Sequence, residues 1–235
     1  MFVKIAIMQP YLFPYIGYFQ LIHTVDVFVL YDDVQFIKKG WIHRNRLLVN
    51  DKDYLFTLSL QKSPRETIIK EKFFSDQFDY EKGKLLQLIE HSYRKAPFFN
   101  EVYPLIQHII SHQDRNVCSF IYQSLVAICG YLEIKTRFIF SSEINKNNAL
   151  KGQEKIIEIN KLLKSDCYIN PIGGTELYSK ARFREEGLEL YFLKPKLIQY
   201  KQFGAEFIPW LSIIDVLMFN SKDIVKNFLN EYQLI

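Results

Sequence analysis

The segment at residues 4–35 contains two short apolar runs joined by a proline-containing loop and a helical stretch. The first run ends at Gln9-Pro10, a second proline follows at Pro14, and helical spacing begins near Gly17. The second run, residues 27–30, ends just before two aspartates. This order predicts strand, loop, helix and strand, and a right-handed crossover makes the two strands parallel. Ligands bind outside the carboxyl ends of such strands, so both following loops are candidate site segments.

The same alternation returns in the second half of the chain. Residues 136–140 predict a strand, residues 153–163 an amphipathic helix, and residues 166–169 and 188–193 two more strands. Two helices, at 208–219 and 223–232, are predicted to end the chain.

Two features interrupt the alternation. Residues 46–49 and 54–60 flank a polar turn and predict a β-hairpin, which a short strand at 68–74 follows. Residues 76–131 show helical spacing throughout, divided into three helices by Pro97 and by residues 114–116. We therefore predict one α/β domain over residues 1–235, with a mainly parallel Rossmann-like sheet, a β-hairpin excursion and a helical insertion at about 76–131.

The net charge bears on the binding partners of the protein, and the cysteine content bears on its cellular compartment. The formal net charge of +4 is small and basic residues alternate with acidic ones, which argues against a nucleic-acid surface. Three cysteines without a CxxC pair favour a reducing compartment. The N-terminus lacks a signal-peptide layout and no apolar run approaches ~20 residues, so we expect a cytoplasmic protein without a membrane span.

The loop at residues 9–14 has two prolines, which fix backbone angles and favour a rigid binding loop that presents Gln9 and Tyr11. The simpler alternative is a strand terminator. Gly17 and Tyr18 open the following helix, whose free amides favour an anion.

Asp32 and Asp33 follow the second strand, with Gln35 close behind. Such carboxylates can hold a metal, accept hydrogen bonds from sugar hydroxyls or act as a base. Adjacent strand residues point to opposite faces, so at most one aspartate enters a given site. A solvated turn is the alternative interpretation.

The segment at residues 38–46 combines cationic, aromatic and amide side chains. Arginines can grip a diphosphate through two parallel hydrogen bonds while a tryptophan stacks on the ligand. A charged sheet edge that resists aggregation is the alternative. The binding candidates in this segment are Trp41, Arg44, Asn45 and Arg46, and His43 is a candidate base.

Asn170, Gly173 and Gly174 belong to a flexible loop after another predicted strand, where backbone can approach a ligand. It matches neither a GxGxxG fingerprint nor a P-loop. His108 and His112 share a helix face without the glutamate of a zinc-protease motif, so we predict no metal site and assign no cofactor. Cys167 is the one cysteine that we consider as a nucleophile.

The four loops at residues 9–18, 32–46, 141–143 and 170–174 each follow a predicted strand. In one parallel sheet they emerge at the same edge, so we expect a single ligand crevice there. That crevice would collect Gln9, Tyr11, Asp32, Asp33, Gln35, Arg44, Asn45, Asn170 and Gly173.

Several stretches resemble the WbqC-like family and together span almost the whole chain. They read IMQPYLFPYIGYFQLI, VFVLYDDVQFIKKGWIHRNRLLV, YRKAPFFNEVYPLI and IPWLSIIDVLMFN. The family opening usually has LPW where this chain has Phe13-Pro14-Tyr15, so a tyrosine replaces the tryptophan. The opening is also similar to the first turn of nucleotidyltransferases and pantothenate synthetases, with Tyr18 in place of their helix-opening histidine.

The family resemblance implies a role in bacterial polysaccharide biosynthesis, in particular that of the O-antigen of lipopolysaccharide. With the second similarity it suggests a transferase that adds an acyl or aminoacyl group, from an acyl donor, to a nucleotide-linked amino sugar. Arg44 and Arg46 would then hold phosphates, Trp41 or Tyr11 would stack, and Asp32 or His43 would act as the base. The alternative is a non-catalytic carbohydrate- or partner-binding protein of the same pathway.

Overall fold

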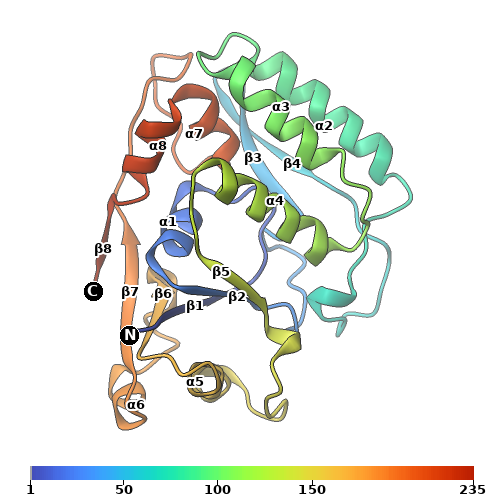
Figure 1. The fold of residues 1–235 in the computed structure, drawn as a ribbon. Helices are drawn as coiled ribbons and strands as arrows, with labels where there is room; N and C mark the ends of the chain where they lie inside the picture. The colour runs from blue at the N-terminus through green and yellow to red at the C-terminus, as the bar shows by residue number, and fades with distance from the viewer. Residues whose placement is uncertain (1) are drawn as a thin grey trace.

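The computed structural model describes residues 2–235 and is built around a six-stranded sheet with strand order β5-β2-β1-β6-β7-β8 (Figure 1). All neighbouring strands are parallel except β7 and β8. The mainly parallel α/β sheet predicted from the sequence is therefore confirmed, while the antiparallel edge strand was not foreseen. The strands are β1 (Lys4–Met8), β2 (Val27–Leu30), β5 (Arg137–Phe140), β6 (Cys167–Pro171), β7 (Glu189–Pro195) and β8 (Tyr232–Leu234).

The order of the strands reverses between β1 and β6. From β1 the chain moves outward to β2 and β5, and then returns to the other side of β1 to build β6 and β7. The connection that follows β1 therefore leads toward β2, whereas the connection that follows β6 leads in the opposite direction, toward β7. Such a reversal is where open α/β sheets form a ligand crevice at the carboxyl ends of their strands.

Helices cover both faces of the sheet. Helices α5 (Gly152–Leu162) and α6 (Lys180–Glu185) lie on one face, and α1 (Ile16–Thr24) and α4 (Val117–Tyr131) lie on the other (Figure 1). The strands alternate accordingly: Ile5 and Ile7 of β1 share a core with Ile156 of α5, whereas Ala6 packs with Phe19 of α1 in the other core. Strands buried on both faces explain why these segments read as continuous apolar runs.

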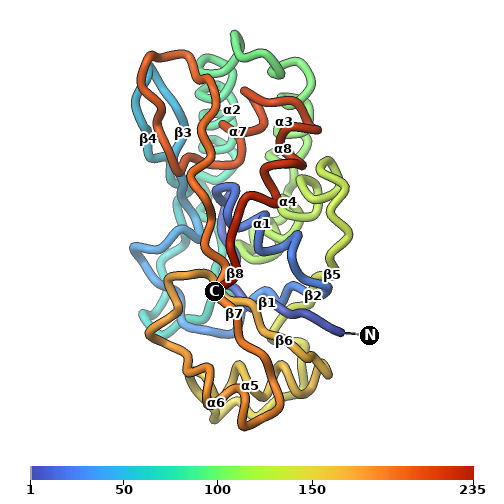
Figure 2. Tube along the Cα trace, turned by 90° about the vertical axis from the view of Figure 1, so that its left-hand side faces the viewer, coloured from blue at the N-terminus to red at the C-terminus, as the bar shows by residue number. Residues whose placement is uncertain are grey.

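A hairpin and a helical layer extend the structure away from α5 and α6 (Figures 1 and 2). The hairpin pairs β3 (Arg44–Val49) with β4 (Lys52–Thr57), and its turn residues Asn50 and Asp51 have positive φ of 50° and 58°. Two positive φ values are what a tight two-residue hairpin turn requires. The helical insertion contains α2 (Phe78–Tyr93), α3 (Phe99–Ile110) and α4, as predicted.

The predicted strand at residues 68–74 is wrong. This segment forms a 3-10 turn, η1 (Ile69–Glu71), flanked by isolated bridges that pair Ile68 with Gln35 and Phe74 with Leu60. The backbone amides of Ile69 and Lys70 donate to Val34 and Asp32, so long-range contacts decide the local conformation.

The last two helices are shorter than predicted. They are α7 (Ile213–Phe219) and α8 (Lys222–Phe228). Trp210 has a positive φ of 60° and Ser212 caps the amide of Ile214, so α7 begins after the predicted position. Tyr232 belongs to β8 rather than to a helix.

A buried carboxylate on α7 is hydrogen-bonded to α2, which in turn contacts the hairpin. Asp215 of α7 is fully buried and accepts hydrogen bonds from Tyr93 (2.9 Å), Tyr200 (2.5 Å) and Gln202 (2.8 Å). The Tyr93 hydroxyl also accepts from the amide of Leu48 in β3 at 2.8 Å. Burial raises the pKa of Asp215, although these hydrogen bonds oppose the rise.

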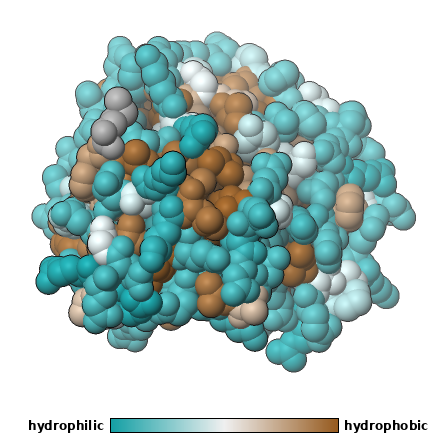
Figure 3. All heavy atoms as spheres, turned by 60° about the horizontal axis from the view of Figure 1, so that its bottom comes forward, coloured by the Kyte–Doolittle hydropathy of each residue, from teal (hydrophilic) through white to brown (hydrophobic). Residues whose placement is uncertain are grey.

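The surface seen from the side of α5 and α6 is mostly hydrophilic, with a hydrophobic patch near its centre (Figure 3). Within residues 2–235, no helix combines the length and the apolar character needed to cross a membrane.

We expect Tyr93→Phe to lower the free energy of unfolding by about 1–3 kcal/mol, because it leaves the buried Leu48 amide without an acceptor. Chemical denaturation measures the change. Tyr80→Phe, on the exposed side of α2, is the control and should leave stability unchanged. Equal stability of both variants would contradict the structural role of the Tyr93 hydroxyl.

Candidate functional site

The loops singled out from the sequence lie at one edge of the sheet. β1, β2, β5 and β6 are parallel, so residues 9–14, 31–35, 141–143 and 170–174 all follow carboxyl strand ends. Their side chains do not line one common cavity. They contribute to two pockets, which we call the aromatic pocket (Tyr11, Pro14 and Ile172) and the Asp33 pocket (Asp33 and Ser142). A third pocket, which we call the basic pocket, is lined instead by Phe36, Lys38, His43, residues 60–65 and Lys72.

The aromatic pocket is a cavity of about 480 Å³ beside the reversal point between β1 and β6. Its walls come from the loop after β1, the start of the hairpin, the ends of β6 and β7, and the loop before α7. Most of its lining is apolar, and two cationic side chains accompany four aromatic rings. The lining residues are Tyr11, Pro14, Tyr15, Trp41, Asn45, Arg46, Ile172, Lys194, Pro195 and Trp210.

Asn45 fixes the loop that carries the two tyrosines of this pocket. Its buried amide nitrogen donates to the carbonyls of Leu12 (2.9 Å) and Phe13 (2.7 Å). The hydroxyl of Ser212 donates to the same Phe13 carbonyl at 2.8 Å. Phe13 has φ of 44°, a left-handed conformation that these contacts hold in place. Tyr11 therefore reaches the pocket from a rigid loop.

Arg46 lines the aromatic pocket with a guanidinium that is only partly hydrogen-bonded. Its guanidinium lies 5.5 Å from the centre of the Trp41 ring, and one terminal nitrogen pairs with Asp53 at 3.1 Å. Its Nε is buried and has no hydrogen-bond partner within residues 2–235. A buried donor without a partner is costly unless a ligand satisfies it.

The aromatic residues of the pocket include two phenols that stay protonated. Burial raises the pKa of Tyr11 and of Tyr15, and the nearby Tyr11 raises that of Tyr15 further. The Tyr15 ring meets Trp210 edge-on with ring centres 5.9 Å apart. Among the described residues that line this pocket, none carries a carboxylate or an imidazole.

The Asp33 pocket is a smaller cavity of about 230 Å³ beyond the end of β2. Asp33 Oδ2 forms ion pairs with the Nζ atoms of Lys146 (2.8 Å) and Lys155 (3.1 Å), and all three side chains are at most 10% exposed. Burial alone would raise the pKa of Asp33, but the two lysines outweigh it and hold the pKa below its ordinary value.

Asp32 lines none of these three pockets but joins two strand ends. It is buried, and its two carboxylate oxygens accept from the amide (2.9 Å) and the hydroxyl (2.7 Å) of Ser142, which follows β5. The adjacent aspartates thus diverge, as strand alternation predicts.

Asn170 and Gly174 are coupled at the end of β6. The Asn170 Oδ1 accepts from the hydroxyl of Tyr168 at 2.8 Å. A Cβ added to Gly174 would lie 1.8 Å from Asn170 Nδ2, whereas one added to Gly173 would meet open space. Gly174 is therefore needed for close packing and Gly173 is free of that constraint.

The remaining candidates are held by neighbouring backbone. The Arg44 guanidinium donates to the carbonyls of Gly40 and Lys39, and the Gln35 amide donates to Arg65 at 3.0 Å. His43 lines the basic pocket, with its Nδ1 at 2.8 Å from the carbonyl of Leu58.

Tyr18 is buried beneath the loop after β1. Its hydroxyl donates to the carbonyl of Gln9 at 2.8 Å, so it supports the loop from inside. Burial raises its pKa well above the ordinary value. Cys167 lies at the start of β6, away from the Gly173 loop, and burial raises its pKa to about 11. A thiol that stays protonated is a poor nucleophile, which corrects our interpretation of Cys167.

The structure adds lining residues that the sequence did not indicate. Trp210 and Lys194 complete the aromatic pocket, and Lys146 and Lys155 complete the Asp33 pocket. Trp210 carried no such signal, because the sequence predicts a helix over residues 208–219 rather than a loop at the pocket. The lysines carried none, since exposed lysines are common.

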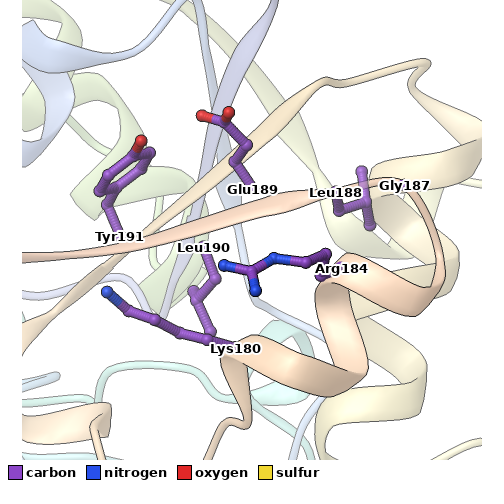
Figure 4. A pocket seen from close by; sticks show the side chains of 7 residues that line it. All are labelled: Lys180, Arg184, Gly187, Leu188, Glu189, Leu190 and Tyr191. Atoms are coloured by element: carbon purple, nitrogen blue, oxygen red, sulfur yellow. The ribbon is translucent and has the colours of Figure 1, made fainter.

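A fourth cavity of about 360 Å³ lies at the opposite end of the sheet (Figure 4). Lys180 and Arg184 extend from α6 beneath Glu189 and Tyr191, which point up from the start of β7. It opens at the amino end of the strand, so it does not belong to the crevice edge. Residues 2–235 contain no cluster of three or more histidine, cysteine or acidic side chains that could hold a metal ion.

We expect Gly174→Ala to destabilise the protein by about 1–3 kcal/mol, because the new methyl group displaces Asn170 from its bond with Tyr168. Gly173→Ala is the matched control, with open space at the same kind of position. Thermal unfolding compares the two. A melting temperature of Gly174→Ala equal to that of Gly173→Ala would contradict the close packing.

We expect Asp33→Asn to cost about 3 kcal/mol at pH 7, because it leaves two buried lysines without a counter-charge. The folded pKa of Asp33 is lowered, so its stabilisation is present above the ordinary value of 3.8 and is lost as the pH falls through the folded pKa. The difference from wild type should thus shrink below about pH 4.

Glu133→Gln provides a matched control for this prediction. Glu133 also binds two lysines, Lys222 at 2.7 Å and Lys226 at 2.6 Å, but its side chain is 56% exposed. Solvent screens such a pair, so its loss should change stability little. Urea denaturation at several pH values measures both variants, and a pH-independent Asp33→Asn effect would contradict the ion-pair origin.

The chain is similar in sequence to known proteins of one family. A model described as the WbqC-like protein family matches residues 9–227. The chain is 28% identical over 222 residues to the uncharacterized protein Rv1507c of Mycobacterium tuberculosis (strain ATCC 25618 / H37Rv), which covers 91% of this chain and 92% of that protein. No solved structure matches significantly. Because the family model covers nearly the whole chain, this protein belongs to the WbqC-like protein family.

Proposed function

We propose that this protein is an enzyme of bacterial O-antigen or polysaccharide biosynthesis. In this proposal the aromatic pocket binds a nucleotide-linked amino sugar, and the enzyme transfers an acyl or aminoacyl group to it. The observation that carries the proposal is the combination of four aromatic rings with the unpartnered Nε of Arg46 at the strand-order reversal. The pathway comes from the resemblance of the chain to WbqC-like proteins.

The chemistry of the pocket suits a ligand with flat and anionic parts. Trp41 and Trp210 offer ring faces for a base or a sugar, and the Tyr11 and Tyr15 hydroxyls can donate to hydroxyl or phosphate oxygens. Arg46 and Lys194 supply the positive charge that a diphosphate needs. A volume of about 480 Å³ lies within the usual range for small-molecule sites.

The two bases suggested by the sequence sit outside this pocket. Asp32 accepts hydrogen bonds from Ser142, and His43 lines the basic pocket. Acyl transfer to an amino group requires a base that removes a proton from the attacking nitrogen. The roles of Asp32 and His43 in this step stay predictions.

The second candidate function is non-catalytic carbohydrate binding in the same pathway. It is favoured by one specific observation: the described lining of the aromatic pocket has neither a carboxylate nor an imidazole. A pocket that only binds needs aromatic faces and hydrogen-bond donors, and both are present.

We expect uridine-diphosphate amino sugars to raise the melting temperature, since a ligand that binds only the folded state stabilises it. Trp210→Ala should weaken binding by about tenfold or more, because losing one stacked ring costs about 1–3 kcal/mol. Tyr80→Ala removes an exposed aromatic side chain on α2 and is the control. Absence of a shift with any nucleotide sugar, or equal affinity of both variants, would overturn ligand binding in this pocket.

A product assay separates the two candidates. Mass spectrometry of the amino sugar, after incubation with the enzyme and an acyl coenzyme A, detects an acyl group added to the nitrogen. Binding with turnover supports the transferase. Binding without turnover across acyl and aminoacyl donors supports the carbohydrate-binding protein.

A further inference from the structure

The basic pocket is a cavity of about 520 Å³ that shares with the aromatic pocket only the segment from which it draws part of its lining, at residues 36–43. It is bounded by residues 36–43, by the loop at 60–65 and by Lys72 after η1. It shares no lining residue with the aromatic pocket. Five basic side chains line it, and its described lining contains no carboxylate; the five are Lys38, His43, Lys62, Arg65 and Lys72.

Lys72 is the central feature of this pocket. The residue is 7% exposed, its ammonium group lies 4.9 Å from the centre of the Phe36 ring, and it donates to the hydroxyl of Ser63. Within residues 2–235 it makes no ion pair. Burial lowers the pKa of Lys72, and the positive charge of Lys38 lowers it further. A buried ammonium without a counter-charge is unfavourable, and a bound anion would supply one.

The other cations around Lys72 are also free of carboxylate partners. In the described chain, neither Lys38, Lys62 nor Arg65 lies within ion-pair distance of an acidic side chain. Other cations of the described chain do have carboxylate partners; Arg182, for example, contacts Glu154 at 2.8 Å and Glu186 at 2.6 Å. Lys38, Lys62, Arg65 and Lys72 therefore line one cavity without ion-pair partners in the described chain.

Backbone hydrogen bonds hold both rims of the pocket in place. The Phe36 amide donates to the carbonyl of Thr67 at 3.1 Å, and the Gln61 amide donates to that of Phe73 at 2.9 Å. The Leu58 carbonyl can only accept, so its 2.8 Å contact fixes a hydrogen on His43 Nδ1. A site whose backbone is fixed before binding loses less entropy when the ligand arrives.

We propose that the basic pocket binds the diphosphate group of a small molecule. Lysine ammonium groups and an arginine guanidinium are the usual protein partners of phosphate oxygens. The cavity is concave and large enough for a diphosphate together with part of the group attached to it. This inference goes beyond the proposed function, because it rests on residues that do not contribute to the aromatic pocket.

Isothermal titration of the 235-residue chain with pyrophosphate tests the proposal. We expect saturable binding that Lys72→Met and Arg65→Gln each weaken about tenfold or more, since each removes a charge-assisted contact of about 1.5–3 kcal/mol. Lys72→Met keeps the length of the side chain without its charge, and Arg65 is exposed, so neither change threatens the fold. Lys84→Met, an exposed lysine on α2, is the control and should bind like wild type.

The aromatic-pocket variant separates this proposal from the proposed function. Trp210→Ala should keep full pyrophosphate affinity even if no nucleotide sugar is found to bind. Competition with coenzyme A and with a uridine-diphosphate sugar then identifies the source of the diphosphate. Displacement by coenzyme A alone assigns the pocket to the donor, and displacement by the sugar nucleotide alone assigns it to the acceptor; both support a diphosphate site.

Three outcomes would overturn the proposal. They are no pyrophosphate binding at millimolar concentration, unchanged affinity in both Lys72→Met and Arg65→Gln, and tighter binding of a short RNA that the same two variants abolish. The last result would assign the cations to a nucleic-acid backbone instead.

Discussion

The amide group of Asn45 is the contact on which the candidate site depends. After β1 the chain must turn sharply, and the turn leaves the carbonyls of Leu12 and Phe13 pointing into a protein interior without backbone partners of their own. One side-chain NH₂ group satisfies both, and Ser212 adds a second donor to Phe13. An aspartate at position 45 would place oxygen against oxygen. The geometry of the loop therefore follows from one amide on a neighbouring hairpin.

This arrangement explains why the hairpin interrupts the α/β alternation. The hairpin carries Asn45 to the loop after β1, and the amide of Ser212 donates to the Arg46 carbonyl at 2.9 Å, which brings in the loop before α7. Tyr93 and Asp215 then attach the hairpin to the helical layer through the Leu48 amide. Segments far apart in sequence are thereby locked around the aromatic pocket, and rigid walls suit a site that must hold a ligand in one orientation.

The sheet was predictable because its information is local. Apolar runs such as residues 27–30 are long enough for a strand and are bounded by polar or proline residues, and the alternation with helices fixes a parallel order. The strand predicted at residues 68–74 was wrong for the opposite reason. Its apolar content suits a strand, but the amides of Ile69 and Lys70 bond to the chain after β2, and no local pattern shows this.

The gathering of the strand-end loops at one edge of the sheet was predictable, but which of their side chains share a cavity was not. Carboxyl strand ends can be recognised from the sequence, yet of the nine residues expected in one crevice only Tyr11 and Asn45 line the aromatic pocket. Whether a charged side chain has a partner depends on distant residues. Arg44 and Arg46 look equivalent in sequence, yet the first is occupied by the carbonyls of Gly40 and Lys39 while the second keeps an unpaired donor.

Charge compensation therefore differs among the three pockets in a way that only the fold determines. In the Asp33 pocket one carboxylate serves two lysines, and the result is a closed cluster that ties β2 to α5. In the aromatic pocket Arg46 is partly compensated by Asp53, whereas in the basic pocket Lys72 makes no ion pair within the described chain. The net charge of +4 understates this asymmetry, because carboxylates elsewhere on the surface offset the cations in the total. What the two larger cavities have in common is positive charge that the protein itself leaves incompletely neutralised, and that property selects anionic ligands.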